Sequence, residues 1–326
     1  MKATAATTRT RFENILFPTD FSADAAHAIP FIKKIAGHFQ SNLVALHVRT
    51  PVVNPMTQPG TWTSDLEAAK IFDKEHREEL VDTFAGINTE VLIEEGDIQS
   101  CLDRAIQKHN ADLVIIGTRG RTGLAKMLLG SVAEEIFRSV TIPVLTVGPH
   151  SDPAKTDTRE ILFATDLASE ASSAAAYAVS LAQEFQARLT LLHVVPEPKP
   201  GDFMSWFDVQ ESSKQRLRKL VPAEIEAWCK PEFLVARGDP AERILDLANL
   251  REVDLIVLGA QAERGVPGAA THLPIATAHK VVAHAYCPVL TVRKVIVGDS
   301  ENARQIKESL GRLDPTLEER FRKPTR

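Results

Sequence analysis

Short apolar runs alternate with longer stretches of mixed polar and apolar residues along most of the chain. The short runs predict buried β-strands, and the longer stretches predict helices with one apolar face. In the first half this pattern predicts, in order, strand 15–19, helix 23–39, strand 43–48, helix 64–84, strand 90–94, helix 98–109, strand 112–116, helix 131–139 and strand 143–147. Strands that alternate with helices are typical of parallel βαβ units, so the pattern predicts a doubly wound α/β domain.

The second half of the chain repeats the first. ENILFPTDFS at 13–22 matches EILFATDLAS at 160–169, and LVALHV at 43–48 matches LTLLHV at 189–194. Further along, EGDIQSCLDRAI matches RGDPAERILDLA, DLVIIG matches DLIVLG, and IPVLTV matches CPVLTV. Similarity at a nearly fixed period indicates a duplicated domain.

The repeat sets the expected domain organisation. Residues 1–148 and 159–295 are expected to form two tandem α/β domains, joined by the linker 149–158, which lies within the polar, Gly- and Pro-containing stretch 148–159. Residues 296–326 are highly charged and form a predicted tail, to which we assign no function. Because an unpaired edge strand is a liability, we expect the two last strands to pair and the domains to pack as a pseudo-two-fold pair. Further association into a homodimer stays open.

Composition narrows the function classes. A net charge of −5 and a pI near 6.1 give no basic footprint, so no nucleic-acid partner is expected. The start of the chain lacks a secretory signal pattern, and the apolar runs are much shorter than the ~20 residues that span a bilayer. We therefore expect a cytoplasmic protein without a membrane partner. Cys101, Cys229 and Cys287 are widely spaced, which favours reduced thiols over disulfides or a metal site.

Two predicted strand ends carry candidate chemistry. In an open parallel sheet, ligands bind beyond the carboxyl ends of the strands, where the strand order reverses. The first strand ends at Asp20, whose carboxylate could accept hydrogen bonds from an adenine amino group or ribose hydroxyls. The fourth strand opens a glycine-spaced loop, Gly117-x2-Gly120-x9-Gly130-Ser131, which leads into a helix. Glycines let a backbone approach a ligand closely, and a helix N-terminus favours anions, so this loop suits a phosphate chain.

Simpler interpretations of the same residues stay open. Ser131 and Glu134 form a capping-box pattern, so Ser131 could cap its helix, bind phosphate, or do both. Asp20 could cap the following helix, either itself or with Ser22 in that role. His47 lies in an apolar strand and, like its counterpart in the second half, is interpreted as a satisfied core histidine without a catalytic role. No metal spacing and no nucleophile elbow are present, so catalytic and metal-binding residues are not predicted.

The first half resembles the universal stress protein family. ILFPTDFS, LVALHV, EEGD and DLVIIGTRGRTGLAKMLLGSVAEEIFRSVTIPVLTV carry the resemblance over nearly all of residues 12–148, and a weaker one covers 159–293. It implies the strand order 3-2-1-4-5 in each five-stranded parallel sheet, and pairing through the last strand. The glycine pattern marks members of that family that bind ATP. By position, the implied binding residues are Pro18, Thr19, Asp20, Val48, Gly117, Thr118, Arg119, Gly120, Gly130, Ser131 and Val132.

The second half departs from the ATP-binding pattern. It keeps Asp166 and Gly259, but Ala262 replaces the second glycine, and Ile275-Ala276 replace the Gly-Ser pair. We therefore expect nucleotide in the first domain and none in the second.

The functional hypothesis is an ATP-binding, nucleotide-dependent stress-response module, with Mg²⁺ as a candidate companion of the phosphates and an unidentified protein partner. One alternative is a slow ATPase or phosphotransfer enzyme, because a phosphate cradle with Mg²⁺ can stabilise a transferred phosphoryl group. No base is identifiable for that reaction, so the sequence favours binding over efficient turnover. The other alternative is an interaction protein that works without nucleotide.

Overall fold

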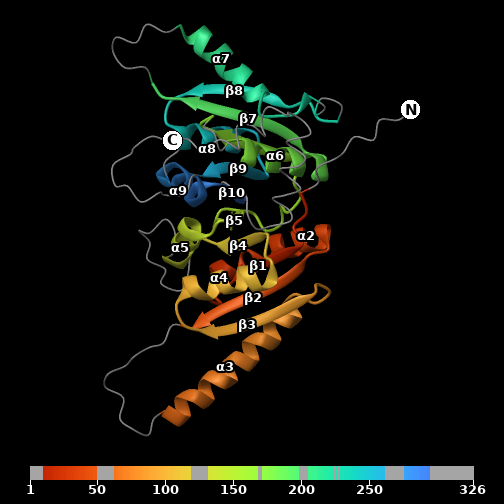
Figure 1. Cartoon of the computed structure of the whole chain (residues 1–326), viewed down its shortest axis with the longest axis vertical. Coiled ribbons are helices and arrows are strands. Elements are labelled where there is room, and N and C mark those ends of the chain that lie inside the picture. The colour runs from red at the N-terminus through yellow and green to blue at the C-terminus, as the bar shows by residue number, and fades with distance from the viewer. Residues whose placement is uncertain are drawn as a thin grey trace, which may run out of the picture. The chain divides into compact units, whose positions relative to one another are not determined.

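A computed structural model of the chain describes residues 10–49, 62–118, 131–167, 171–197, 205–223, 225, 228–260 and 275–293. The chain packs as two compact units, Phe12–Val140 and Met1–Arg11 with Thr141–Arg326. Each unit combines strands with helices, as the hydrophobic pattern predicts (Figure 1).

The first unit contains four strands and five helices among its described residues. They are β1 (Asn14–Pro18), α1 (Ala23–Ala26), α2 (Ile29–Phe39), β2 (Asn42–Arg49), α3 (Trp62–Thr83), β3 (Thr89–Glu95), α4 (Ile98–His109), β4 (Leu113–Gly117) and α5 (Ser131–Ser139). The single helix predicted for 23–39 is wrong, because the chain forms two helices there. Pro30 lies in the first turn of α2, where its missing N–H costs nothing, whereas a proline inside one long helix would break the hydrogen-bond ladder.

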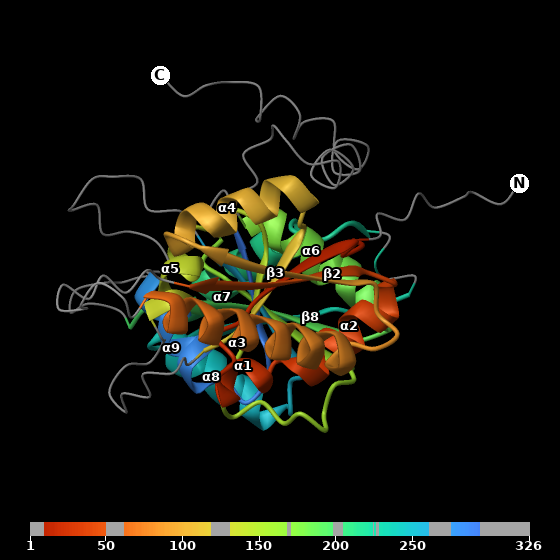
Figure 2. The ribbon, with the colours of Figure 1, turned by 90° about the horizontal axis from the view of Figure 1, so that it is seen from below.

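The strands of the first unit run in the order β3-β2-β1-β4, and all described pairs are parallel. Helix α4 lies on the opposite side of β2 and β3 from α2 and α3 (Figure 2). Phe17 of β1, Phe84 after α3 and Leu102 of α4 belong to the buried core, and each is at most 1% exposed. Phe17 and Phe84 meet edge to face, with 6.0 Å between ring centroids. The first unit is therefore a doubly wound α/β structure, with helices on both faces of the sheet.

The second unit holds the remaining elements. They are β5 (Val144–Val147), β6 (Glu160–Thr165), α6 (Ala171–Phe185), β7 (Arg188–Val195), α7 (Trp206–Arg218), β8 (Glu232–Arg237), α8 (Pro240–Leu250), β9 (Leu255–Ala260), α9 (Ile275–His284) and β10 (Val289–Arg293). Strands β6 to β10 take the order β8-β7-β6-β9-β10 and pair in parallel. The order 3-2-1-4-5 is thus confirmed for the second repeat, and the order of the first four strands is confirmed in the first repeat.

Strand β5 is the last strand of the first repeat, yet it groups with the second unit. It pairs antiparallel with β10, the last strand of the second repeat. Leu145 lies opposite Leu290, and these leucines occupy equivalent positions in the two repeats. The expectation that the two last strands pair is confirmed. An antiparallel register that brings equivalent residues opposite each other is what a two-fold relation between these two strands produces.

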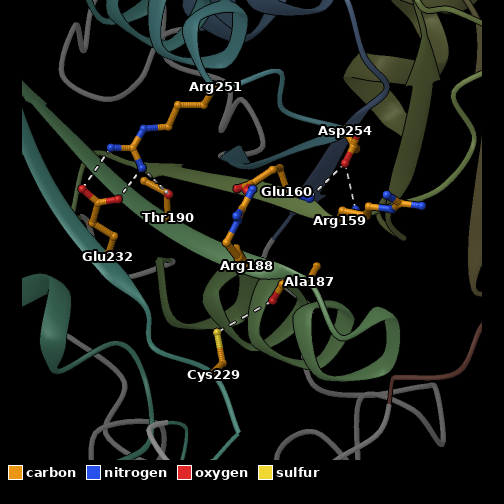
Figure 3. A network of polar contacts seen from close by, with 9 residues as sticks. All are labelled: Arg159, Glu160, Ala187, Arg188, Thr190, Cys229, Glu232, Arg251 and Asp254. Atoms are coloured by element: carbon orange, nitrogen blue, oxygen red, sulfur yellow. Dashed lines mark hydrogen bonds and ion pairs between the residues drawn. The ribbon is translucent and has the colours of Figure 1, made fainter.

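The two repeats build different polar clusters at the amino ends of their strands. In the first repeat, three asparagines form a ladder, in which Asn88 donates to Asn42 at 2.7 Å and Asn42 donates to Asn14 at 2.9 Å. In the second repeat, ion pairs occupy the corresponding region (Figure 3). Arg251 forms a bidentate ion pair with Glu232, in which its Nη2 lies 3.0 Å from Oε1, and it also donates to Thr190 Oγ1. Arg188 forms an ion pair with Glu160. This end of each sheet is therefore free to diverge without a change of fold.

Candidate functional site

Three strand ends meet at the carboxyl edge of the first sheet. The β1–β2 register places Pro18 beside Leu46, and the Thr19 N–H extends this ladder by donating to the Leu46 carbonyl at 2.9 Å. Strand β4 flanks β1 on its other side. Because all three strands are parallel, their carboxyl ends lie at the same edge. Six of the residues implied by the family resemblance come together here, namely Pro18, Thr19, Asp20, Val48, Gly117 and Thr118.

The turn after β1 is held by its own polar side chains. The Thr19 Oγ1 accepts from the Phe21 N–H at 3.1 Å, and the Asp20 carboxylate accepts from the Ser22 N–H at 3.0 Å. Phe21 adopts a left-handed conformation with φ of 58°, which non-glycine residues take only where the surroundings enforce it. Ser22 caps α1 by accepting from the Ala25 N–H at 3.1 Å. Of the two capping alternatives, Ser22 is the cap, and Asp20 stabilises the turn.

His47 of β2 joins this turn from the neighbouring strand. Its side chain is buried, and its Nδ1 lies 2.8 Å from the Thr19 carbonyl oxygen. Since a carbonyl only accepts, Nδ1 is the protonated nitrogen in this contact. The imidazole ring also packs against Phe21 at 4.7 Å between centroids, and His76 of α3 lies 4.2 Å from the same phenyl ring. His47 is therefore a buried, hydrogen-bonded histidine, as interpreted from sequence.

Gly117, the last residue of β4, lies against the backbone of α1. A Cβ at Gly117 would be 2.3 Å from the Asp24 carbonyl oxygen and 3.2 Å from the Ala25 Cα. Both atoms belong to the backbone, so they cannot rotate away as a side chain could. Gly117 thus has a packing role of its own, apart from any ligand. The next residue, Thr118, is 2% exposed.

The second repeat reproduces the turn but not the loop. Thr165 Oγ1 accepts from the Leu167 N–H at 3.0 Å, Leu167 has φ of 61°, and His193 Nδ1 lies 2.9 Å from the Thr165 carbonyl oxygen. Burial lowers the pKa of His193. Helix α9 begins with Ile275 and Ala276, neither of which carries a hydroxyl, and its first hydroxyl side chain is Thr277. Among the residues that the structure describes, a Cβ at Gly259 would meet the Ala174 Cβ at 3.4 Å. The two repeats therefore share the turn after their first strand, β1 or β6. They differ after their fourth strand, β4 or β9.

The sequence profile of the universal stress protein family matches residues 11–148 and again residues 158–293. The chain belongs to the universal stress protein family. A universal stress protein of Thermus aquaticus is 36% identical over 140 residues, which cover 41% of this chain and 98% of that protein. One of Mycolicibacterium smegmatis is 23% identical over 292 residues, or 86% of this chain and 96% of its own length. A universal stress protein structure from Archaeoglobus fulgidus shares the fold, with a TM-score of 0.65 and 19% identity over 87% of this chain and 99% of that one. The predicted family and tandem organisation are confirmed.

The structure places the other predicted residues of the first universal stress protein domain only in part. Arg119, Gly120 and Gly130 lie outside the described residues. Ser131 is the first residue of α5, and Val132, in its first turn, is 37% exposed. The helix that follows the glycine-spaced segment is therefore present where the sequence predicts it.

Charged residues lie next to Val48 at the end of β2. Arg49 forms ion pairs with Asp73 of α3 at 3.4 Å and with Glu95 of β3 at 3.8 Å. These carboxylates come from α3 and β3, so the guanidinium is held by two elements next to β2. In the described parts of this universal stress protein, no group of three His, Cys, Asp or Glu side chains is arranged to hold a metal ion. Nor does any helix there have the length and apolar character needed to cross a bilayer.

Sequence reasoning missed two features of the site. The His47 contact to Thr19 was not predicted, although a histidine recurs at the same place in LVALHV and LTLLHV. The packing role of Gly117 was also missed, because it depends on where α1 passes. The histidine that recurs in both repeats could have indicated the His47 contact. No feature of the sequence indicates the packing role of Gly117.

Proposed function

We propose that the first universal stress protein domain binds ATP at the carboxyl edge of β2, β1 and β4, and that the chain works as a nucleotide-dependent regulatory module in the stress response. The observation that carries the proposal is the convergence of the Thr19–Asp20 turn with the end of β4, where the glycine-spaced segment starts. A strand-order reversal of this kind is the usual ligand position in open α/β sheets.

The residues at this edge suit the two parts of a nucleotide, the nucleoside on the Asp20 side and the phosphates on the β4 side. The Asp20 carboxylate already accepts one backbone hydrogen bond, and carboxylate oxygens have room for several donors, including ribose hydroxyls or an amino group. On the β4 side, the spacing Gly117-x2-Gly120-x9-Gly130-Ser131 leads into the N-terminus of α5. Free backbone N–H groups at a helix N-terminus favour anions such as a phosphate chain.

The second domain provides an internal comparison. It retains the turn with Asp166, but Ile275-Ala276 stand where the first domain has Gly130-Ser131. Two hydrogen bonds to a charged phosphate that are no longer made would cost roughly 3–6 kcal/mol. That energy corresponds to at least about a hundredfold weaker binding. We therefore propose one tight ATP site per chain, in the first domain.

Isothermal titration calorimetry of the full chain with ATP tests the proposal. We expect a stoichiometry of one, strongly weakened binding in Gly130→Val, and unchanged binding in Asp166→Ala. Gly130→Val is preferred because a β-branched side chain would block close approach of a phosphate. Two equivalent sites would show that the glycine spacing does not decide binding, and a single site lost in Asp166→Ala would move the site to the second domain.

Two further measurements separate the other functions. Mass spectrometry of ligand released from the natively purified protein identifies the bound nucleotide without a prior assumption. A single-turnover reaction with ATP and Mg²⁺ distinguishes binding from hydrolysis, and we expect ATP to be recovered largely intact. If neither the purified protein nor the titration shows a nucleotide, the chain acts as an interaction protein without one.

A further inference from the structure

The backbone of Thr19 is fixed on both sides by β2. Its N–H donates to the Leu46 carbonyl at 2.9 Å, and its carbonyl oxygen accepts from His47 Nδ1 at 2.8 Å. Thr19 is 9% exposed and His47 is 8% exposed, so water has little access to replace this contact. A buried carbonyl that loses its donor carries a desolvation cost. The imidazole N–H thus takes the place of a backbone N–H as the next donor along the β1–β2 ladder, at the point where β1 turns away from β2.

The fixed carbonyl is the start of the turn that presents Asp20. Two residues further on, Phe21 takes its left-handed conformation, and the N–H groups of Phe21 and Ser22 donate to the side chains of Thr19 and Asp20, respectively. A left-handed non-glycine residue costs energy and persists only where the surrounding contacts enforce it. This set of contacts therefore helps to fix the orientation of the carboxylate.

The second repeat shows that the contact does not depend on the aromatic neighbours. His193 contacts the Thr165 carbonyl at 2.9 Å, and the following turn has the same hydrogen bond and the same left-handed residue. At that left-handed position the second repeat has Leu167 in place of Phe21. The ring contacts of Phe21 with His47, Phe72 and His76 are thus an addition of the first repeat. The histidine donor, in contrast, is common to both turns, as are the threonine hydrogen bond and the left-handed residue.

We propose that His47 is a positioning residue of the nucleotide site, which orients the Asp20 carboxylate by donating its Nδ1–H to the Thr19 carbonyl. This inference rests on the proposed ATP binding of the first domain. It assigns His47 no contact with the nucleotide and no proton transfer. Binding affinity responds to His47 because a ligand pays less to meet a carboxylate that is already oriented.

Side-chain geometry provides a matched set of variants. Asparagine carries its amide nitrogen on Cγ, where histidine carries Nδ1, so His47→Asn retains a donor close to the Thr19 carbonyl. His47→Gln has a similar volume but carries its amide nitrogen one atom further out, and His47→Ala removes the donor entirely. Phe21→Leu removes the ring contact and leaves the hydrogen bond, with the residue that the second repeat uses. His193→Gln is the matched change in the second domain.

Two readouts on the full chain test the proposal. The first is amide hydrogen exchange of Phe21 and Ser22 without nucleotide, and the second is the ATP dissociation constant by calorimetry. For both His47→Gln and His47→Ala we expect at least tenfold faster exchange and at least tenfold weaker ATP binding. His47→Asn, Phe21→Leu and His193→Gln are expected to stay within about threefold of the wild type in both readouts.

The outcomes discriminate between the explanations. If His47→Gln and His47→Ala leave exchange and affinity unchanged, His47 does not position the turn. If His47→Asn is impaired as strongly as His47→Gln, the ring and not the Nδ1 donor matters, and the proposal is overturned. If the wild type binds no ATP, the proposed function fails by itself, and the exchange rates alone decide the role of the donor. Faster exchange in His47→Gln but not in His47→Asn would then still support it.

Discussion

Replacing Gly117 with alanine tests how closely α1 packs on the end of β4. The added Cβ would be 2.3 Å from the Asp24 carbonyl oxygen and 2.8 Å from the Asp24 carbonyl carbon. Ordinary contact begins near 3.4 Å, so α1 must move by about 1 Å to accommodate one methyl group. The backbone angles of Gly117 lie outside the left-handed region, so steric overlap is the whole cost.

The equivalent glycine of the second repeat is the control. Within the described part of the chain, a Cβ at Gly259 would meet the Ala174 Cβ at 3.4 Å, and φ there is also outside the left-handed region. Overpacking typically costs about 1–3 kcal/mol, and we expect Gly117→Ala to lie at the upper end because backbone atoms must move. Gly259→Ala should change the free energy of unfolding by less than about 1 kcal/mol, since glycine-to-alanine changes without strain even stabilise slightly.

The measurement has to resolve the two domains, because a two-domain chain need not unfold in one step. Urea unfolding gives the loss of stability, and hydrogen exchange followed by mass spectrometry assigns it to peptides of β1, α1 and β4. Equal effects of Gly117→Ala and Gly259→Ala, or no effect of Gly117→Ala, would refute the reasoning. The result also guides the choice of nucleotide-binding variants, because a change at Gly117 perturbs packing before it reports on ligand.

Two further predictions concern ionisable groups. Burial raises the pKa of Asp112 to about 7, so its folded state holds a proton that the unfolded state releases near pH 4. Its contribution to stability is therefore present below about pH 4 and lost as the pH rises to about 7, by at most about 1.4 kcal/mol per pH unit. Asp112→Asn should flatten the pH dependence of the unfolding free energy between about pH 4 and 7, and an unchanged slope would contradict this. The thiols of Cys101, Cys229 and Cys287 are buried, and burial raises the pKa of Cys287 to about 12. We expect a disulfide reagent to label them only after denaturation, and rapid labelling of the native chain would show that the packing opens.

Much of the fold could be predicted because the sequence contains the same domain twice. The helices expected at 98–109 and 131–139 begin and end where the structure has α4 and α5. In α4, Asp97 caps the helix by accepting from the Ser100 N–H, which makes its start visible in the sequence. The break between α1 and α2 was missed, since the apolar periodicity continues through it and only Pro30 indicates it.

The candidate site was predictable as a set of residues but not as a geometry. The motif identified Asp20 and Gly117, and parallel pairing of β1 and β4 brings these strand ends to one edge. Which residue caps α1, how His47 holds Thr19, and why Gly117 lacks a side chain depend on contacts between elements distant in sequence. Periodicity and spacing describe single elements, so they carry no information on such contacts.

The pairing of Leu145 with Leu290 has an evolutionary consequence. If two identical chains met through this strand, each substitution at the seam would enter on both sides at once, and only self-compatible changes would survive. Here the two leucines are separate codons of one gene, so either can change alone and the other can adapt to it. Because both strands belong to one chain, the partner strand is present at any protein concentration. The β5–β10 contact can therefore weaken without the two strands separating. Gene fusion thus removes the requirement for symmetry, and one repeat can lose its glycine loop while the other keeps it.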